Sequence, residues 1–317
     1  MAATGGRTHA KYSNRARAGV HFRLCLAGRS GPAEAERRGK DMNIEAQVRK
    51  AQAFRAMHDR SAILVLPNAW DAVTARLFAR LGYAAVATTS GGVAWSLGYP
   101  DGEHVPLSEV VAATGRIARA VDVPVTADME AGYGAAPEVV ADTVRAVIEA
   151  GAVGINLEDG LHAPGALRAI EAAAERIRAA REAAAAAGVP IIINARTDTY
   201  MLKYGASDAE RFDETVRRAS AYLAAGADCV FPIGLGDGAA LGALVRALDA
   251  PVNVAARPGM PGLAELARLG VARVSTATRF ATVALSAVER AAKELRESGR
   301  FECLGAALTH PDVQRLF

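Results

Sequence analysis

One pattern recurs through most of this 317-residue chain and restricts its fold more than any other feature. From about residue 60, a short apolar run rich in β-branched residues is followed by a longer segment with the periodicity of an amphipathic helix. Runs that are apolar throughout are typical of parallel strands covered on both faces. Eight such runs are present: Ile63–Leu66, Ala84–Thr88, Val123–Ala127, Val153–Leu157, Ile191–Ala195, Cys229–Pro232, Val252–Ala255 and Arg273–Thr276.

Eight strand–helix units in succession predict a closed (β/α)₈ barrel. The main alternative is a doubly wound open sheet, which usually has a glycine-rich turn after its first strand. Here the sequence Leu-Pro-Asn-Ala-Trp, residues 66–70, stands in that place. We also expect an extra helix at residues 44–57 and a helical extension after the last strand. The intervening helices are expected at Asp71–Leu81, Pro137–Ala150, Leu167–Ala187 and Asp208–Ala225, and five glycines are suited to end helices: Gly82, Gly151, Gly188, Gly226 and Gly270.

The basic residues in excess are concentrated at the start of the chain. Residues 1–41 hold nine Lys or Arg and three acidic residues, a net charge of +6, whereas the whole chain carries only +3. The rest of the chain is therefore mildly acidic, at −3. We predict that residues 1–41 form a basic, disordered leader and that residues 42–317 form a single barrel domain that includes the C-terminal helices. The leader is rich in Arg, like a transit peptide, but a disordered extension or a start site upstream of Met42 is the simpler interpretation.

The composition excludes several classes of protein. No apolar run approaches the roughly 18 residues that would span a bilayer, so we expect no membrane segment. The basic leader has only two aromatic residues, Tyr12 and Phe22, and no repeated interleaving of aromatic with basic residues, so we expect no nucleic-acid partner. The three cysteines have neither metal-ligand nor redox spacing, which favours reduced thiols and a cytoplasmic location. None of the five lysines lies in a predicted strand, which leaves a Schiff-base mechanism without a nucleophile.

Acidic residues follow three of the predicted strands. Asp128 and Glu130 end the third strand, Glu158 ends the fourth, and Asp101 lies in the loop after the second. Residues 128 and 130 are two apart, so on an extended chain their side chains point the same way, and the neighbouring strand brings Glu158 to the same patch. Carboxylates this close raise one another's pKa unless a cation compensates them. The set suits Mg²⁺ or Mn²⁺, although any one of these acids alone is more readily an ion-pair partner or a helix cap.

Two other segments at strand ends carry polar groups. The Ser-Gly-Gly sequence at residues 90–92 would present successive backbone N–H groups to a carboxylate or phosphate oxygen, though Gly-Gly is also a common plain turn. Arg196 ends the fifth strand and can grip a carboxylate or oxyanion, or it can pair with the nearby Asp198. The glycine-rich residues 234–238 are interpreted as a tight turn between strand and helix. Both the turn at 90–92 and Arg196 are therefore candidates for binding an anion.

In these segments the sequence resembles the isocitrate lyase/phosphoenolpyruvate mutase superfamily, over about Ile44 to Leu295. The Ser-Gly-Gly and Ala-Arg-Thr-Asp stretches look closest to the methylisocitrate lyase branch. The resemblance implies a (β/α)₈ barrel enzyme with Mg²⁺ as cofactor and a small carboxylic acid as substrate. The matching segments are residues 68–71 (Asn-Ala-Trp-Asp), 90–94 (Ser-Gly-Gly-Val-Ala), 97–101 (Leu-Gly-Tyr-Pro-Asp), 128–134 (Asp-Met-Glu-Ala-Gly-Tyr-Gly), 158–159 (Glu-Asp) and 195–198 (Ala-Arg-Thr-Asp).

The resemblance also implies roles for individual positions. Asp128 would be the direct Mg²⁺ ligand, and Asp101, Glu130 and Glu158 would hold the ion through its waters. Arg196 would face the developing oxyanion. The candidate substrate-binding residues are Ser90, Gly91, Gly92, Arg196 and Asn253, and the candidate catalytic residues are Asp101, Glu158, His162 and Arg196.

Two departures from the lyase pattern concern the proton donor. The lyases carry Lys-Arg-Cys-Gly-His in the loop after the fourth strand, and their Cys protonates the leaving acid; here residues 159–165 read Asp-Gly-Leu-His-Ala-Pro-Gly. His162 can act as an acid near neutral pH, or it is an ordinary exposed loop residue. The sixth strand ends with Phe231, Pro232 and Ile233, where the lyases have a Glu after Phe-Pro. The sequence therefore predicts the metal centre but leaves the proton donor open.

Three functions fit these residues. The first is a Mg²⁺-dependent carbon–carbon lyase, or a related hydrolase or decarboxylase, of a small 2-hydroxy or 2-oxo acid. The second is phosphorus–carbon chemistry of the phosphonopyruvate kind, by a mutase or hydrolase, which runs without the Cys loop. The third is a barrel that binds a carboxylate without turning it over. Because superfamily members usually exchange their eighth helix within dimers of dimers, the resemblance implies a homodimer or homotetramer in which Thr278–Arg296 and the tail to Phe317 serve assembly.

Overall fold

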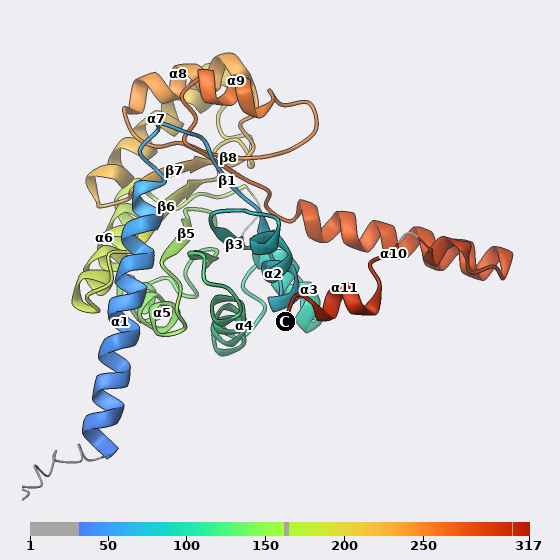
Figure 1. Cartoon of the computed structure of the whole chain (residues 1–317). Helices are drawn as coiled ribbons and strands as arrows, with labels where there is room; N and C mark the ends of the chain where they lie inside the picture. Colours follow the sequence, from blue (N-terminus) through green and yellow to red (C-terminus); the bar gives the residue numbers. More distant parts are fainter. Residues whose placement is uncertain (1–31, 162–164, 306) are drawn as a thin grey trace, which may run out of the picture. The chain divides into compact units, whose positions relative to one another are not determined.

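The centre of the molecule is a set of short parallel strands surrounded by helices (Figure 1). The computed structural model describes residues 32–161, 165–305 and 307–317, with residues 32–43 described for their backbone alone. Each of the eight predicted runs contains a strand, which confirms the pattern. The strands are β1 (Leu64–Leu66), β2 (Asn68–Ala69), β3 (Val86–Thr88), β4 (Val125–Asp128), β5 (Gly154–Glu158), β6 (Ile192–Thr197), β7 (Cys229–Pro232), β8 (Asn253–Ala255) and β9 (Arg273–Ser275).

The strands close into a barrel. Strands β2 to β7 pair in order in one sheet, and β1, β9 and β8 form a second. Pro67 separates β1 from β2, since proline has no N–H for the ladder. The two pieces of this first strand pair with neighbours on opposite sides, β1 with β9 and β2 with β3, both in parallel. A bridge between Val230 and Val252 joins β7 to the segment before β8 and completes the ring. The predicted (β/α)₈ barrel is confirmed.

Helices follow the strands and cover the outside of the barrel (Figure 1). The five glycines expected to end helices all have positive φ, from +70° at Gly188 to +108° at Gly226, a conformation that other residues rarely adopt. The glycine-rich residues 234–238 form the turn between β7 and the next helix, as predicted. The helices around the barrel are α2 (Ala72–Arg80), α3 (Ser90–Leu97), α4 (Leu107–Ala120), α5 (Pro137–Glu149), α6 (Ile170–Ala186), α7 (Asp208–Ala224), α8 (Gly238–Leu248) and α9 (Leu263–Arg268).

Helix α1 (Pro32–Ala56) precedes the barrel and starts earlier than predicted. Disorder was expected up to residue 41, but residues 32–41 are helical, because Ala, Glu and Arg follow a proline that suits the first helical turn. Residues 1–31 lie outside the described residues. The chain divides into two compact units, residues 1–40 and 41–317. Within the second, Phe54 is fully buried, and Nε2 of Gln47 donates to the carbonyl groups of residues 148 and 152, before β5.

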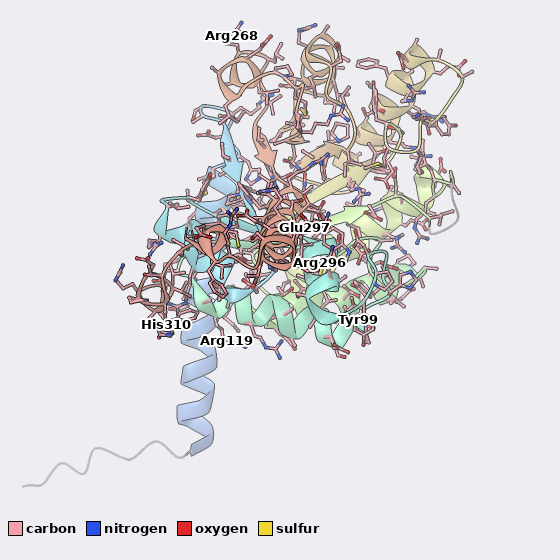
Figure 2. All side chains as sticks on the ribbon, turned by 90° about the vertical axis from the view of Figure 1, so that its right-hand side faces the viewer. Tyr99, Arg119, Arg268, Arg296, Glu297 and His310 are labelled. Atoms are coloured by element: carbon pink, nitrogen blue, oxygen red, sulfur yellow. The ribbon has the colours of Figure 1, made fainter. Side chains whose placement is uncertain are left out.

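The C-terminal helix α10 (Arg279–Ser298) extends away from the barrel (Figure 1). Figure 2 looks toward its far end, where Arg296 and Glu297 lie at the centre of the view. Apolar residues on this helix, among them Val283 and Val288, are exposed. The 3₁₀ turn η1 (Glu302–Leu304) and α11 (His310–Gln314) then lead the chain end back to α2. None of the helices in the described part of the chain, α10 included, is long and apolar enough to cross a membrane.

Candidate active site at the carboxyl end of the barrel

A cavity of about 600 Å³ lies at the carboxyl ends of the barrel strands. This is the end at which (β/α)₈ barrels gather side chains from several loops. Four of the predicted site residues line it: Ser90, Asp101, Asp128 and Arg196. Other residues on the cavity wall include Asn156, Tyr200, Lys203, Phe231, Ile233, Ala255, Ala256, Arg257, Ser275, Thr278 and Arg279.

Asp128, the last residue of β4, is held by its neighbours. Its Oδ2 accepts the backbone N–H of Ser90 at 3.2 Å, and its Oδ1 lies 3.4 Å from Nδ2 of Asn156. Its own backbone N–H donates to Oγ1 of Thr88 at 2.8 Å. These contacts come from β3, α3 and β5, so the carboxylate predicted to bind the metal directly has a fixed position on the cavity wall.

Asp101 and Glu130 lie close to Asp128, as predicted. Burial and the charge of Asp128 raise the pKa of Asp101, and burial with the charges of Asp128 and Asp101 raises the pKa of Glu130 to about 7. The geometric reason given for Glu130 is wrong, however, because β4 ends at Asp128 and Glu130 has a left-handed backbone, with φ of +48°. Its carboxylate is instead directed by the backbone N–H of Glu103 at 2.8 Å and the hydroxyl of Tyr133 at 3.2 Å.

The Ser-Gly-Gly sequence forms the first turn of helix α3, not the glycine turn that was expected. The first amides of a helix have no acceptor within it, and the N–H of Ser90 uses this freedom to donate to Asp128. The glycines are required by close packing. A Cβ atom on Gly91 would lie 3.0 Å from Oδ2 of Asp101, and one on Gly92 would lie 2.9 Å from Cβ of Trp70. Small residues therefore allow α3 to approach the acidic group.

Arg196, in β6, is held between two carboxylates. Its Nη1 lies 2.7 Å from Oε2 of Glu158, and its Nε and Nη2 donate to Asp198 at 2.6 and 3.0 Å. Burial lowers the pKa of Arg196, but the charges of Glu158 and Asp198 outweigh burial and raise it, so the guanidinium stays charged. Both interpretations of Arg196 are thus observed, since it pairs with Asp198 and also lines the cavity. Glu158 is an ion-pair partner of Arg196, and its role toward a metal stays a prediction.

A buried hydrogen-bond network supports the Arg196–Asp198 pair. The backbone N–H of Asp198 donates to Oδ1 of Asp159 at 2.9 Å. The other oxygen of Asp159 accepts from the hydroxyl of Tyr222 at 2.6 Å and from Nη1 of Arg218 at 3.1 Å. Asp159 is almost completely buried and is not on the cavity wall. Asp159 therefore serves the lyase-like motif by holding the backbone of Asp198 in position, and not by contact with the cavity.

Of the predicted site residues in the described ranges, Gly91, Gly92, Glu130, Glu158 and Asn253 do not line this cavity. Asn253 is fully buried inside the barrel, where its Nδ2 donates to Oγ of Ser275 at 3.2 Å and its Oδ1 has no partner among the described residues. It lies two positions before Ala255 on β8, so it points the same way but one layer deeper than the cavity wall. His162 falls outside the described residues, and its role stays a prediction. Ile233, in place of the lyases' Glu, does line the cavity.

Sequence reasoning missed a set of cations on the same wall. Lys203 lies in the loop after β6, Arg257 in the loop after β8, and Arg279 at the start of α10. No motif marks these residues, and their positions shortly after predicted strands were the only available signal. It also missed Asn156, whose Oδ1 accepts from Nδ2 of Asn194 at 2.8 Å inside the barrel and whose Nδ2 faces Asp128.

The acidic group fits a magnesium ion held largely through water. In the part of the chain that the structure describes, no three His, Cys, Asp or Glu side chains are placed to hold a metal ion by themselves. Mg²⁺ usually keeps several waters and takes only one or two carboxylates. Asp128 as the direct ligand, with Asp101 and Glu130 beside it, is such a set. A divalent cation would also compensate the charges that now raise the pKa values of Asp101 and Glu130.

Comparison with known proteins places the chain in a family. Residues 54–296 match the family of phosphoenolpyruvate phosphomutase. The chain belongs to this family. It is 35% identical over 246 residues to an uncharacterised protein of Mycobacterium tuberculosis, covering 77% of this chain and 89% of the relative. It is also 35% identical over 189 residues to the 2-methylisocitrate lyase of Escherichia coli, covering 57% of this chain and 61% of the lyase.

Solved structures of the phosphoenolpyruvate phosphomutase family share the barrel. A Burkholderia cenocepacia protein described as a lyase/mutase matches with a TM-score of 0.80 at 41% identity, covering 86% of this chain and 96% of that one. The resemblance to the isocitrate lyase/phosphoenolpyruvate mutase superfamily is therefore confirmed. The chain is an enzyme of a superfamily whose members are lyases and mutases.

Proposed function

We propose that this enzyme is a Mg²⁺-dependent carbon–carbon lyase, or a closely related hydrolase or decarboxylase, that acts on a small 2-hydroxy or 2-oxo acid. The observation that carries the proposal is that Asp128, Asp101 and Arg196 line one cavity. Carboxylates suited to a cation thus lie beside a guanidinium suited to an anion. The 35% identity to a 2-methylisocitrate lyase supports the same chemistry. Mn²⁺ is an alternative cation for the same oxygen ligands.

The chain's own residues would hold and orient the substrate. Asp128, with Asp101 and Glu130, would hold Mg²⁺, which when bound supplies Lewis-acid stabilisation of a negatively charged oxygen. The amides in the first turn of α3 would donate to the substrate carboxylate. Arg196 stays charged because Glu158 and Asp198 flank it, and it would stabilise the oxygen that becomes negative as the carbon–carbon bond breaks.

The proton donor separates two candidate reactions. Breaking a carbon–carbon bond leaves a carbanion that must be protonated, and the described part of the cavity wall contains no Cys, His or Glu. We assign this role to His162, in the loop at residues 159–165. The loop at residues 159–165 lacks the lyases' Cys, and this departure favours phosphorus–carbon chemistry of the phosphonopyruvate kind as the second candidate, since that chemistry runs without the lyases' acid loop.

An assay with three substrates tests the proposal. Purified protein with Mg²⁺ is incubated with 2-methylisocitrate, oxaloacetate or phosphonopyruvate, and pyruvate, oxalate, phosphate and phosphoenolpyruvate are measured against a control without enzyme. Pyruvate from 2-methylisocitrate, or pyruvate or oxalate from oxaloacetate, supports the proposal. Turnover of the phosphonate alone would overturn it in favour of phosphorus–carbon chemistry. Stabilisation by pyruvate or oxalate with no product from any substrate would instead identify a barrel that only binds carboxylates.

We further propose that the enzyme is a homo-oligomer, a dimer or tetramer, in which α10 is exchanged between subunits. The exposed apolar residues of α10, Val283, Leu285 and Val288, support this, because such patches on a protein surface commonly mark contact sites. Light scattering on the purified protein measures the mass directly. A mass of one subunit at micromolar concentration would contradict the proposal.

A further inference from the structure

The cavity has a charged side that the proposed function does not use. Lys203, Arg257 and Arg279 line its wall, and all three side chains are also exposed to solvent. None of the three forms an ion pair with any residue in the described ranges. Arg196 differs, because Glu158 and Asp198 compensate its charge. The three outer cations therefore keep a positive charge that a ligand can compensate.

The barrel separates Arg257 from the acids. Three strand positions lie between β4 and β8 in either direction around the ring, so the two strands are opposite each other. Asp128 ends β4, and Arg257 follows β8 by two residues. The acids on the described part of the wall are Asp101 and Asp128, both on the β4 side. A ligand that reaches from one side to the other would therefore meet the proposed Mg²⁺ site at one end and positively charged side chains at the other.

The wall between the two charged sides is apolar. Phe231 and Ile233 contribute to it from the end of β7, and Ala255 and Ala256 from the end of β8. The volume of about 600 Å³ exceeds what a three- or four-carbon acid fills, since pockets of roughly 300–1,000 Å³ accommodate drug-sized ligands. A carbon chain would contact these side chains without leaving polar groups unpaired.

Arg257 is held in place by the turn beneath it. A Cβ atom on Gly236 would lie 2.5 Å from Nη2 and 2.9 Å from Nε of Arg257, so the guanidinium packs directly on this glycine. Arg257 also lines a second cavity of about 540 Å³, which shares Tyr200 and Gly234 with the first. The absence of a side chain at position 236 thus lets Arg257 lie between the two cavities.

We propose that Lys203, Arg257 and Arg279 form a distal anion subsite. It selects a 2-oxo or 2-hydroxy acid that carries a second anionic group, a carboxylate or a phosphonate, at the other end of an apolar carbon chain. The proposal rests on the proposed function, which places the 2-oxygen and its carboxylate at the acidic side. The distal group then accepts charge-assisted hydrogen bonds from the three cations.

Binding of matched 2-oxo acids tests the subsite. Calorimetric titrations with Mg²⁺ at constant ionic strength compare 2-oxoglutarate with 2-oxovalerate, which have the same five-carbon chain and differ in the distal carboxylate. We expect 2-oxoglutarate to bind about tenfold more tightly, a difference of about 1.4 kcal/mol. The triple variant Lys203→Gln, Arg257→Gln, Arg279→Gln should lose this preference and keep the affinity for pyruvate. A separate titration with 4-phosphono-2-oxobutyrate distinguishes a phosphonate from a carboxylate.

Arg268→Gln provides the matched control. Arg268 ends α9 at an exposed edge of the molecule and does not line the cavity (Figure 2). This variant should keep the preference for 2-oxoglutarate. Equal affinities of 2-oxoglutarate and 2-oxovalerate for the wild-type protein would overturn the subsite. An equal loss for pyruvate and 2-oxoglutarate in the triple variant would do the same, because it would show general attraction of anions. If pyruvate shows no Mg²⁺-dependent binding, the proposed function fails and the subsite with it.

Discussion

Two groups of charged side chains lie at one cavity, and they differ in burial and in the contacts that hold them: Asp101 and Asp128 line its acidic side, with Glu130 close to Asp128. Asp128 and Glu130 are held by backbone N–H groups, and Glu130 is buried. Lys203 and Arg279 are exposed and make no ion pair with a described residue. A Mg²⁺ ion requires ligands at fixed positions. The exposed side chains of Lys203 and Arg279 can instead follow an anion whose position depends on substrate length, around the guanidinium of Arg257 that packs on Gly236. The difference agrees with the roles that we propose, in which the acidic group binds the metal and the basic group selects the distal end of the substrate.

Removing the carboxylate of Asp128 should have the largest effect of the substitutions considered. Asp128→Ala is expected to abolish the Mg²⁺-dependent rise in Tm with pyruvate or oxalate, and to weaken Mg²⁺ binding by about 100-fold or more, the upper end of what the loss of a mere supporting residue costs. Scanning fluorimetry with and without Mg²⁺ measures the change in Tm, and a titration with Mg²⁺ gives the affinity. Asp122→Ala, at an exposed acid just before the same strand, is the control and should behave as wild type. Retained Mg²⁺-dependent stabilisation in Asp128→Ala would show that the metal site is wrongly assigned.

Arg196 lies where the two groups meet, and its substitution tests whether it serves the reaction or only its neighbours. Arg196→Lys cannot maintain contacts to both Glu158 and Asp198, so we expect kcat to fall by about 100-fold, as for loss of an oxyanion donor. Arg217→Lys is the control, because Arg217 is an exposed arginine on α7 that pairs with Glu214. A kcat equal to that of the wild type would leave Arg196 as a structural partner of Asp198.

His162 tests whether the acidic side also supplies a proton. His162→Ala is expected to lower turnover by roughly tenfold or more, the lower part of the range for a general acid. His310→Ala, in the C-terminal tail and labelled in Figure 2, should leave the rate unchanged. Steady-state kinetics with the best of the three assay substrates gives the turnover rate of each variant. Equal rates for the two variants would make His162 an ordinary loop residue.

The smallest expected effect comes from the packing of α3 on the acidic group. A Cβ atom on Gly91 would lie 2.9 Å from Cγ2 of Thr278 and 3.0 Å from Oδ2 of Asp101. Overpacking of this kind costs about 1–3 kcal/mol, and we expect Gly91→Ala to weaken Mg²⁺ binding by several-fold, up to about tenfold, in calorimetry. Gly262→Ala is the control, because its Cβ would meet no atom within 4 Å and its φ is −70°. Unchanged Mg²⁺ affinity in Gly91→Ala would show that Asp101 is not held by this contact.

Most of the fold could be predicted because strand and helix patterns are local. Each of the eight apolar runs contains an observed strand, and the glycines that follow helices have the positive φ expected of them. The division of the first strand at Pro67 was not predicted, since it depends on which strands pair on either side. The helical start at Ser90 was missed for a related reason, because two glycines favour a turn unless tertiary packing requires small residues in a helix.

The site was predicted only where motifs stand at strand ends. Asp128, Asp101 and Arg196 were found in this way, and all three line the cavity. The three outer cations were missed, because no periodicity or motif marks loop residues and their convergence depends on closure of the barrel. Asn253 does not line the cavity, since its position along β8, one layer below the cavity wall, is set by the register of the strands, and its role toward a substrate stays a prediction.

If the acidic group binds the substrate anion through a divalent cation, removing the cation abolishes binding of that anion. Calorimetric titration of the wild-type enzyme with pyruvate, once with Mg²⁺ and once with EDTA, measures this. We expect saturable binding with Mg²⁺ and no detectable binding with EDTA. Equal affinity under both conditions would contradict it, because the anion would then be bound by Arg196 and the outer cations without any metal.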